Sequence, residues 1–244
     1  MSATITWATA KRVLRQLSHD PRTLVMLVLV PSLLMVLLRF VFDDDAIFDR
    51  IALPLLGVFP LIIMFLVTSV AMLRERTSGT LERLLTTPLH KLDLLLGYGI
   101  AFTLAAAVQA GIATATAYLF LGLNTQGAPG WVVGVAVSNA VLGMALGLFV
   151  SAFARSEFQA VQFMPLIVLP QLLTCGLLIA RDQMAGWLEA ISNVLPMSYA
   201  VEGLQEIGAQ SEVTGTLILD LGVVLGATVI ALGLGALTLR RRSD

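Results

Sequence analysis

The stretch RERTSGTLERLLTTP, residues 74–88, decides how this chain is arranged, because it is the longest charged interruption between long apolar runs. Its second half is patterned as a short amphipathic helix. Three leucines at i, i+3 and i+4 spacing share one face of that helix: Leu81, Leu84 and Leu85. The Ser78 hydroxyl suits the start of the helix as a cap, and Pro88 ends it. We therefore predict a surface helix at the membrane, with its polar face toward water.

The composition is that of a membrane protein. Of 244 residues, 57% are hydrophobic and only 13% are charged, and the mean hydropathy is +0.90. A water-soluble core cannot use this much apolar surface. The net charge of −1 favours no nucleic-acid partner, and the one cysteine, Cys175, excludes an internal disulfide. The expected surroundings are therefore a lipid bilayer.

Six apolar segments reach the about 20 residues that a membrane-spanning helix needs. They are residues 23–42, 51–73, 94–121, 131–153, 159–180 and 217–239. The first of them is already of membrane length, so no cleavable signal peptide is expected. The fold class predicted is an all-α integral membrane protein, with residues 1–244 forming one transmembrane domain.

The basic residues set the predicted orientation. With both termini in the cytoplasm, twelve of the 15 Lys and Arg residues lie on the inner side, and only Arg39, Arg50 and Arg181 lie outside. The outer side instead collects acidic residues, among them Glu202, Glu206 and Asp182. No pair of acids is predicted at membrane depth, so no proton relay is expected.

Two further segments are patterned for the membrane surface. Residues 1–21 contain an amphipathic helix over 4–18 that is expected to lie on the cytoplasmic face. Residues 181–216 carry two short apolar stripes separated at Pro196. Because each is too short to cross a bilayer, we predict a re-entrant hairpin of two helices before the last span.

The motif ERTSGTLERL, residues 75–84, followed by a proline, resembles the first cytoplasmic loop of the ATP-binding-cassette (ABC) type-2 permeases. These are the membrane subunits of drug, antibiotic, and lipid or polysaccharide exporters. The matching positions are Glu75, Gly79, Thr80, Glu82 and Pro88. Thr77 departs from the family, which usually has a second acid there.

The resemblance implies that this loop holds a coupling helix pushed by a separate ATPase subunit, which would bind the ATP and Mg. The implied coupling residues are Glu75, Arg76, Gly79, Thr80, Leu81, Glu82, Arg83, Leu84, Leu85 and Pro88. It also implies a second permease copy, in a homodimer or close heterodimer, and the plasma (inner) membrane of a prokaryote. The outer hairpin pattern of the family resembles Leu195, Pro196, Tyr199 and Glu202. An ordinary solvated loop and an outer loop packed only for stability are the alternatives.

Four polar residues are predicted at membrane depth: Gln109, Asn139, Gln162 and Gln171. Each alone favours a hydrogen bond between helices, whereas together they could line a pathway. Small residues one helical turn apart also predict close helix packing. The examples are Gly143 with Gly147, and Gly222 with Gly226.

Motifs for chemistry are missing from the sequence. It has no phosphate-binding loop of the Gly-x-x-x-x-Gly-Lys-Ser/Thr type, no His-Glu-x-x-His and no Cys-x-x-Cys. We therefore expect no metal site, no cofactor in this chain and no enzyme activity. The predicted function is a permease that exports an amphipathic substrate with energy from a partner ATPase. The alternative is a secondary transporter or channel that works alone.

Overall fold

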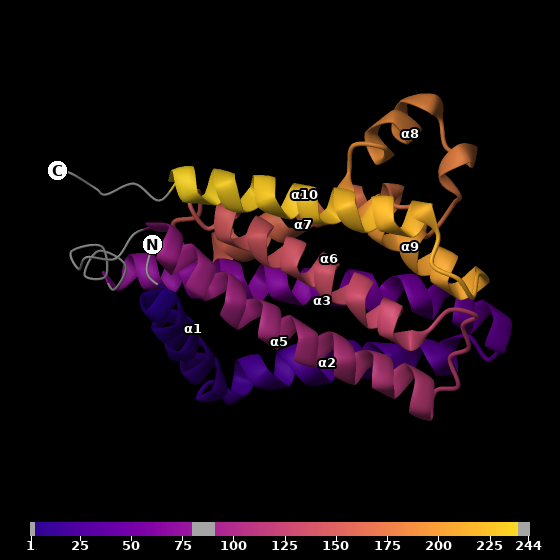
Figure 1. Cartoon of the computed structure of the whole chain (residues 1–244), viewed down its shortest axis with the longest axis horizontal. Coiled ribbons are helices and arrows are strands. Elements are labelled where there is room, and N and C mark those ends of the chain that lie inside the picture. The colour runs from indigo at the N-terminus through magenta and orange to yellow at the C-terminus, as the bar shows by residue number, and fades with distance from the viewer. Residues whose placement is uncertain (1–2, 80–90, 239–244) are drawn as a thin grey trace.

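The computed structural model describes residues 3–79 and 91–238 (Figure 1). These two ranges fold into nine α-helices and one 3-10 helix, without strands. In chain order the elements are α1 (Ala3–Ser18), α2 (Pro21–Val41), α3 (Asp45–Thr77), α5 (Lys91–Phe120), α6 (Pro129–Val150), α7 (Glu157–Thr174), η1 (Arg181–Gln183), α8 (Gly186–Ser192), α9 (Pro196–Ala209) and α10 (Gly215–Thr238). The all-α prediction is confirmed for the part that the structure describes.

Five helices are long and apolar enough to cross a membrane: α2, α3, α5, α6 and α10. Each overlaps most of one predicted span, and α3 extends beyond its predicted ends at both sides. The chain is therefore a multi-pass membrane protein. α1 has nearly the bounds of the amphipathic helix predicted over residues 4–18.

The predicted span 159–180 is not among these five. Its helix, α7, has 18 residues, which makes it about 27 Å long, slightly short of a typical hydrocarbon core of about 30 Å. It contains three glutamines and a glutamate, and it ends at Thr174 instead of Ala180. Gly176 then takes a φ of +89°, a left-handed conformation that breaks the helix. A sixth span is therefore not established by length and composition.

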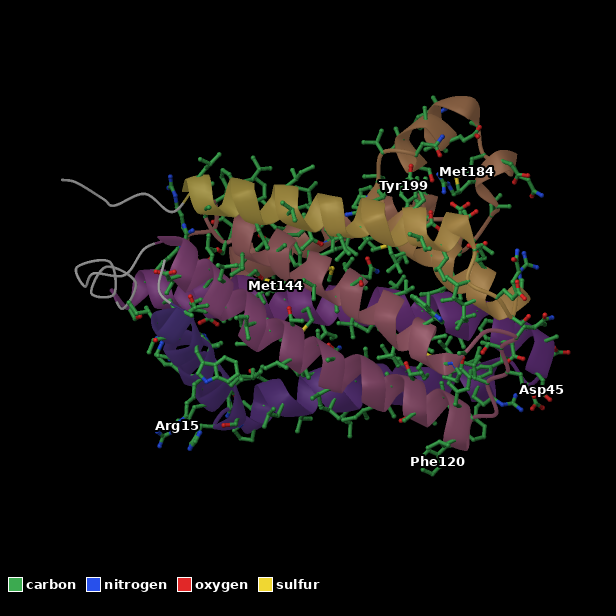
Figure 2. The ribbon with its side chains drawn as sticks, viewed as in Figure 1. Arg15, Asp45, Phe120, Met144, Met184 and Tyr199 are labelled. Atoms are coloured by element: carbon green, nitrogen blue, oxygen red, sulfur yellow. The ribbon has the colours of Figure 1, made fainter. Side chains whose placement is uncertain are left out.

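α3 is the centre of the bundle. It packs against α2, α5, α6, α7 and α9, and 72% of its most apolar window is buried, compared with 17% for α2 and 28% for α10. Figure 1 shows the long helices aligned side by side along the long axis, and Met144 of α6 lies inside the bundle (Figure 2). α2 and α10 thus present most of their apolar surface to the outside.

Glycines allow close contact between α3 and α6. A Cβ atom on Gly143 would lie 2.2 Å from the Leu61 carbonyl oxygen, and one on Gly147 would lie 2.5 Å from the Phe65 carbonyl oxygen. This confirms the predicted packing role of the first glycine pair. The second pair, Gly222 and Gly226, faces open space, because α10 packs through a different side.

The two ends of the bundle differ. One end, here called the α1 end, carries α1, the end of α3 and the starts of α5 and α7; the other carries α8 and α9 (Figure 1). The predicted break between two short helices is present at 193–195. The apolar stripe of α9 is buried, whereas α8 keeps Trp187 and Ile191 exposed. α8 stands out from the side of the bundle.

Candidate functional site

The charged motif begins on α3 instead of in a loop. α3 continues through Arg74, Glu75 and Arg76 to Thr77, and Ser78 is its C-cap, with its N–H bonded to the Arg74 carbonyl. Gly79 follows with a φ of +71°, the left-handed conformation that commonly ends a helix. Ser78 therefore closes α3, where the sequence predicted that it would begin the next helix.

Most of the predicted coupling helix lies outside the described residues. This applies to Thr80, Leu81, Glu82, Arg83, Leu84, Leu85 and Pro88. Their arrangement and their role remain predictions. The structure describes both flanks of this segment, namely the end of α3 and the start of α5.

A polar cluster around Arg12 joins these flanks to α1. Arg12 of α1 donates hydrogen bonds to Glu75 Oε1 of α3 at 2.9 Å and to the Tyr98 hydroxyl of α5 at 3.1 Å. Its guanidinium also lies 5.9 Å from the centre of the Tyr98 ring, at cation–π distance. Glu75, expected to face a soluble partner, is instead buried, with 8% of its surface exposed. One arginine thus holds α1, α3 and α5 together.

α1 packs closely against α5. A Cβ atom on Gly97 would lie 2.6 Å from Thr9 Cβ, so the missing side chain allows the two helices to touch. The Thr6 hydroxyl lies 3.5 Å from Asp93 Oδ1 along the same contact, and Ala10 and Val13 are buried in the shared core. α1 is therefore packed against the bundle over its whole inner face.

A second ion pair fixes the end of α3 from the other side. Arg74 binds both carboxylate oxygens of Glu157, the first residue of α7, at 2.7 and 3.1 Å. This bidentate contact holds the pKa of Glu157 below its ordinary value. Arg76 is half-buried. The last turn of α3 is thus tied to α1 and to α7.

The four polar residues predicted at membrane depth lie in different environments. Asn139 of α6 is fully buried and donates to the Gly57 carbonyl of α3 at 3.0 Å. Gln171 bonds to its own helix at the Ile167 carbonyl. Gln109 is buried, whereas Gln162 is exposed. Asn139 therefore supports the prediction that a polar residue at membrane depth forms a hydrogen bond between helices.

At the α8–α9 end the hairpin residues form a second polar cluster. Arg181 donates to Glu202 and to Asn193, and its guanidinium lies 5.2 Å from the centre of the Tyr199 ring. The Tyr199 hydroxyl donates to the Asn193 carbonyl at 2.7 Å. Leu195 caps α9 and Pro196 is its first residue, a favoured helix-starting position. Of the residues in this cluster, the sequence indicated only Tyr199 and Glu202. Arg181 and Asn193 are further members that only the structure shows.

Sequence reasoning also missed the partners Arg12, Tyr98 and Glu157. Arg12 lies in the predicted amphipathic helix over 4–18, but periodicity alone does not show which neighbour covers it. Contacts that join residues 63 or 83 positions apart leave no trace in local spacing.

Comparison with known proteins gives the family. Residues 4–208 match the model of the ABC-2 type transporter family. The chain is 24% identical over 208 residues to the probable multidrug ABC transporter permease YbhS of Escherichia coli (strain K12), covering 84% of this chain and 55% of that protein. It is 27% identical over 217 residues to the daunorubicin resistance ABC transporter permease protein DrrB1 of Streptomyces coeruleorubidus, covering 85% and 75%.

A third relative is the linearmycin resistance permease protein LnrN of Bacillus subtilis (strain 168), 26% identical over 168 residues, with 69% of this chain and 43% of that protein covered. This chain therefore spans about half the length of several relatives that it matches. Because the family model matches most of the chain, the chain belongs to the ABC-2 type transporter family.

Proposed function

We propose that this chain is the permease subunit of an ABC exporter, driven by ATP hydrolysis in a separate subunit. The observation that carries the proposal is the Arg12 cluster. It ties α1 to both helices that flank residues 80–90, the segment in which the sequence predicts the coupling helix. Relatives named as permeases of multidrug and antibiotic-resistance transporters support the same function.

The contacts of the α1 end suggest how a push would be transmitted. Tight packing and ion pairs make α1, the last turn of α3 and the first turns of α5 one connected block. The Arg74–Glu157 pair extends this block to α7. A force applied to the segment between α3 and α5 would then move these helices together, because packed helices respond as rigid bodies. Closure of the ATPase subunits on ATP would supply that force.

The membrane arrangement belongs to the same proposal. Both termini and the α1 end face the cytoplasm, as the distribution of Lys and Arg predicts. α7 acts as a sixth span, and two copies of the permease assemble with two ATPase subunits in the inner membrane of a prokaryote. The substrate is an amphipathic molecule taken from the cytoplasm or the inner leaflet.

A transporter that works alone is the less favoured alternative. Such proteins place charged residues at mid-membrane depth, where ions or protons bind. In the described part of the chain, the buried carboxylates are Glu75, Asp93 and Asp220. Each lies within the first or last two turns of its helix. This placement fits anchoring contacts near the membrane surfaces better than an ion path.

Charge reversal in the predicted coupling helix tests the proposal. Glu82→Lys should abolish ATP-dependent efflux from proteoliposomes that hold the permease and its ATPase, while membrane insertion stays normal. Asp43→Lys is the matched control, since Asp43 is exposed at the opposite end of the bundle. Normal efflux by a correctly inserted Glu82→Lys protein would refute the coupling role.

A further inference from the structure

A cavity of about 840 Å³ opens at the α8–α9 end. It lies between the start of α3, the segment after α7, α8, α9 and the start of α10, on the side where Figure 2 labels Tyr199 and Met184. Its volume is in the range of pockets that hold drug-sized organic molecules, about 300–1,000 Å³.

The charged lining of the cavity is predominantly acidic. Five acidic residues and two arginines, Arg50 and Arg181, line it. The carboxylates belong to Asp49, Asp182, Glu189, Glu202 and Asp220. Arg181 already donates to Glu202 and Asn193, so it has limited capacity for a further anion. The cavity therefore favours a positively charged guest.

Among the residues that line the cavity, Asp220 of α10 indicates most clearly that a ligand binds here. Only 3% of its surface is exposed, and its Oδ2 atom has no hydrogen-bond partner among the described residues. The carboxylate is directed toward α9, where a Cβ atom on Gly203 would lie 3.6 Å from Oδ2. A buried carboxylate without a partner is destabilising. Because Asp220 lines the cavity, a cation held there would supply the counter-charge that this carboxylate lacks.

The remaining wall indicates an organic cation. Apolar side chains line the cavity beside the acids, namely Leu53, Pro54, Leu178 and Leu219. Within the described ranges, no group of three or more His, Cys, Asp or Glu residues is arranged to hold a metal ion. An ammonium-type group on an apolar body matches both the carboxylates and the apolar wall.

We propose that this cavity binds the cationic group of an amphipathic organic molecule, with Asp220 as its carboxylate partner. The inference rests on the proposed export function, for which it names the substrate class. With the α1 end in the cytoplasm, the cavity lies at the outer end of the bundle. It would therefore hold the molecule after it has crossed the membrane and before it is released.

Ethidium, a permanent aromatic cation, is the probe, and Nile red is the uncharged comparison. Fluorescence polarisation measures binding of each to the purified 244-residue chain in nanodiscs of neutral lipid, without an ATPase. Asp220→Asn should weaken ethidium binding by about tenfold or more, which corresponds to the loss of one favourable charge contact, and should leave Nile red binding unchanged. Asp220→Glu, which keeps the charge, should retain binding within about threefold.

Asp43→Asn is the matched control, because it removes an exposed acid at the same end, outside the cavity lining. It should bind ethidium like the wild type. Equal ethidium affinity in wild type and Asp220→Asn, or equal loss in Asp43→Asn, would overturn the proposal. Stoichiometric Ca²⁺ binding that depends on Asp220, without ethidium binding, would also overturn the organic-cation class.

A second measurement needs no variant. Dicyclohexylcarbodiimide labels buried carboxyl groups, and mass spectrometry of the wild-type protein locates the label. Ethidium should reduce labelling of Asp220 several-fold, whereas Nile red should not, and equal labelling with and without ethidium would contradict the site. Both measurements use the permease alone. If the permease were not coupled to an ATPase, the results of both measurements would therefore be unchanged. If ethidium did not bind, the coupling proposal would still stand.

Discussion

Replacing Arg12 with alanine should release α1 from the bundle. The substitution removes the Glu75 ion pair, the hydrogen bond to Tyr98 and the cation–π contact in one step. Glu75 would keep the amide of Gln16, which lies 3.5 Å from Oε1, and its other oxygen lacks a hydrogen-bond partner in the described structure. A nearly buried carboxylate would thus be left without its counter-charge.

The structure limits the size of this effect. The side chains of Arg12 and Glu75 are 29% and 10% exposed, so the pair lies between a surface ion pair and a buried one. Surface pairs contribute about 0–1 kcal/mol, while loss of one partner of a buried pair costs about 3–5 kcal/mol. We expect a loss of about 1–2 kcal/mol, because water still reaches the arginine.

Hydrogen exchange of the α1 amides in nanodiscs measures this loss directly. A local opening free energy lower by about 1–2 kcal/mol accelerates exchange by about 5–30-fold. Arg15→Ala is the control, since it removes the same charge from the same helix and Arg15 points away from the bundle (Figure 2). Its exchange should match the wild type. Equal exchange in Arg12→Ala and Arg15→Ala would refute the reasoning.

Two further substitutions test the bundle itself. Gly143→Ala should destabilise the protein by about 1–3 kcal/mol, because its Cβ would meet the Leu61 carbonyl oxygen at 2.2 Å, while Gly134→Ala, which faces open space, should leave the melting temperature unchanged. Asp20 caps α2, and a hydrogen bond from Thr23 lowers its pKa below 3.8. Its stabilising effect is therefore present above the ordinary pKa of an aspartate and is lost as the pH falls through the lowered pKa. Asp20→Ala should speed exchange in the first turn of α2 at pH 6, and the difference from the wild type should shrink as the pH falls through the lowered pKa. Similar melting temperatures for both glycine variants, or equal exchange with and without Asp20 at pH 6, would contradict these expectations.

Much of the fold could be predicted because membrane helices are local in sequence. Runs of apolar residues gave five of the helices, and the spacing of Gly143 and Gly147 predicted close helix packing, although not that α3 is the partner. The α7 segment was harder, since its prolines and glutamines offset its apolar residues and Gly176 ends it early. Length and apolarity alone overestimated that span.

The sites were less predictable because they depend on contacts between distant segments. The sequence indicates Glu75 as a coupling residue, but its partner Arg12 lies 63 positions away and cannot be found from local spacing. Asp220 lies near the start of the apolar run 217–239, and only the packing of α9 beside α10 shows that it is a buried carboxylate. Helical spacing shows which residues share a face, but not which helix covers that face.

The most direct test of the central claim is purification of the tagged chain from native membranes in mild detergent, with identification of the proteins that remain bound. A soluble protein with a phosphate-binding loop should co-purify with the wild type. It should be lost when Glu82 and Leu84 are both replaced, and retained in the Asp43→Lys control. A chain that purifies alone, even after crosslinking in intact membranes, would contradict an ATP-driven permease.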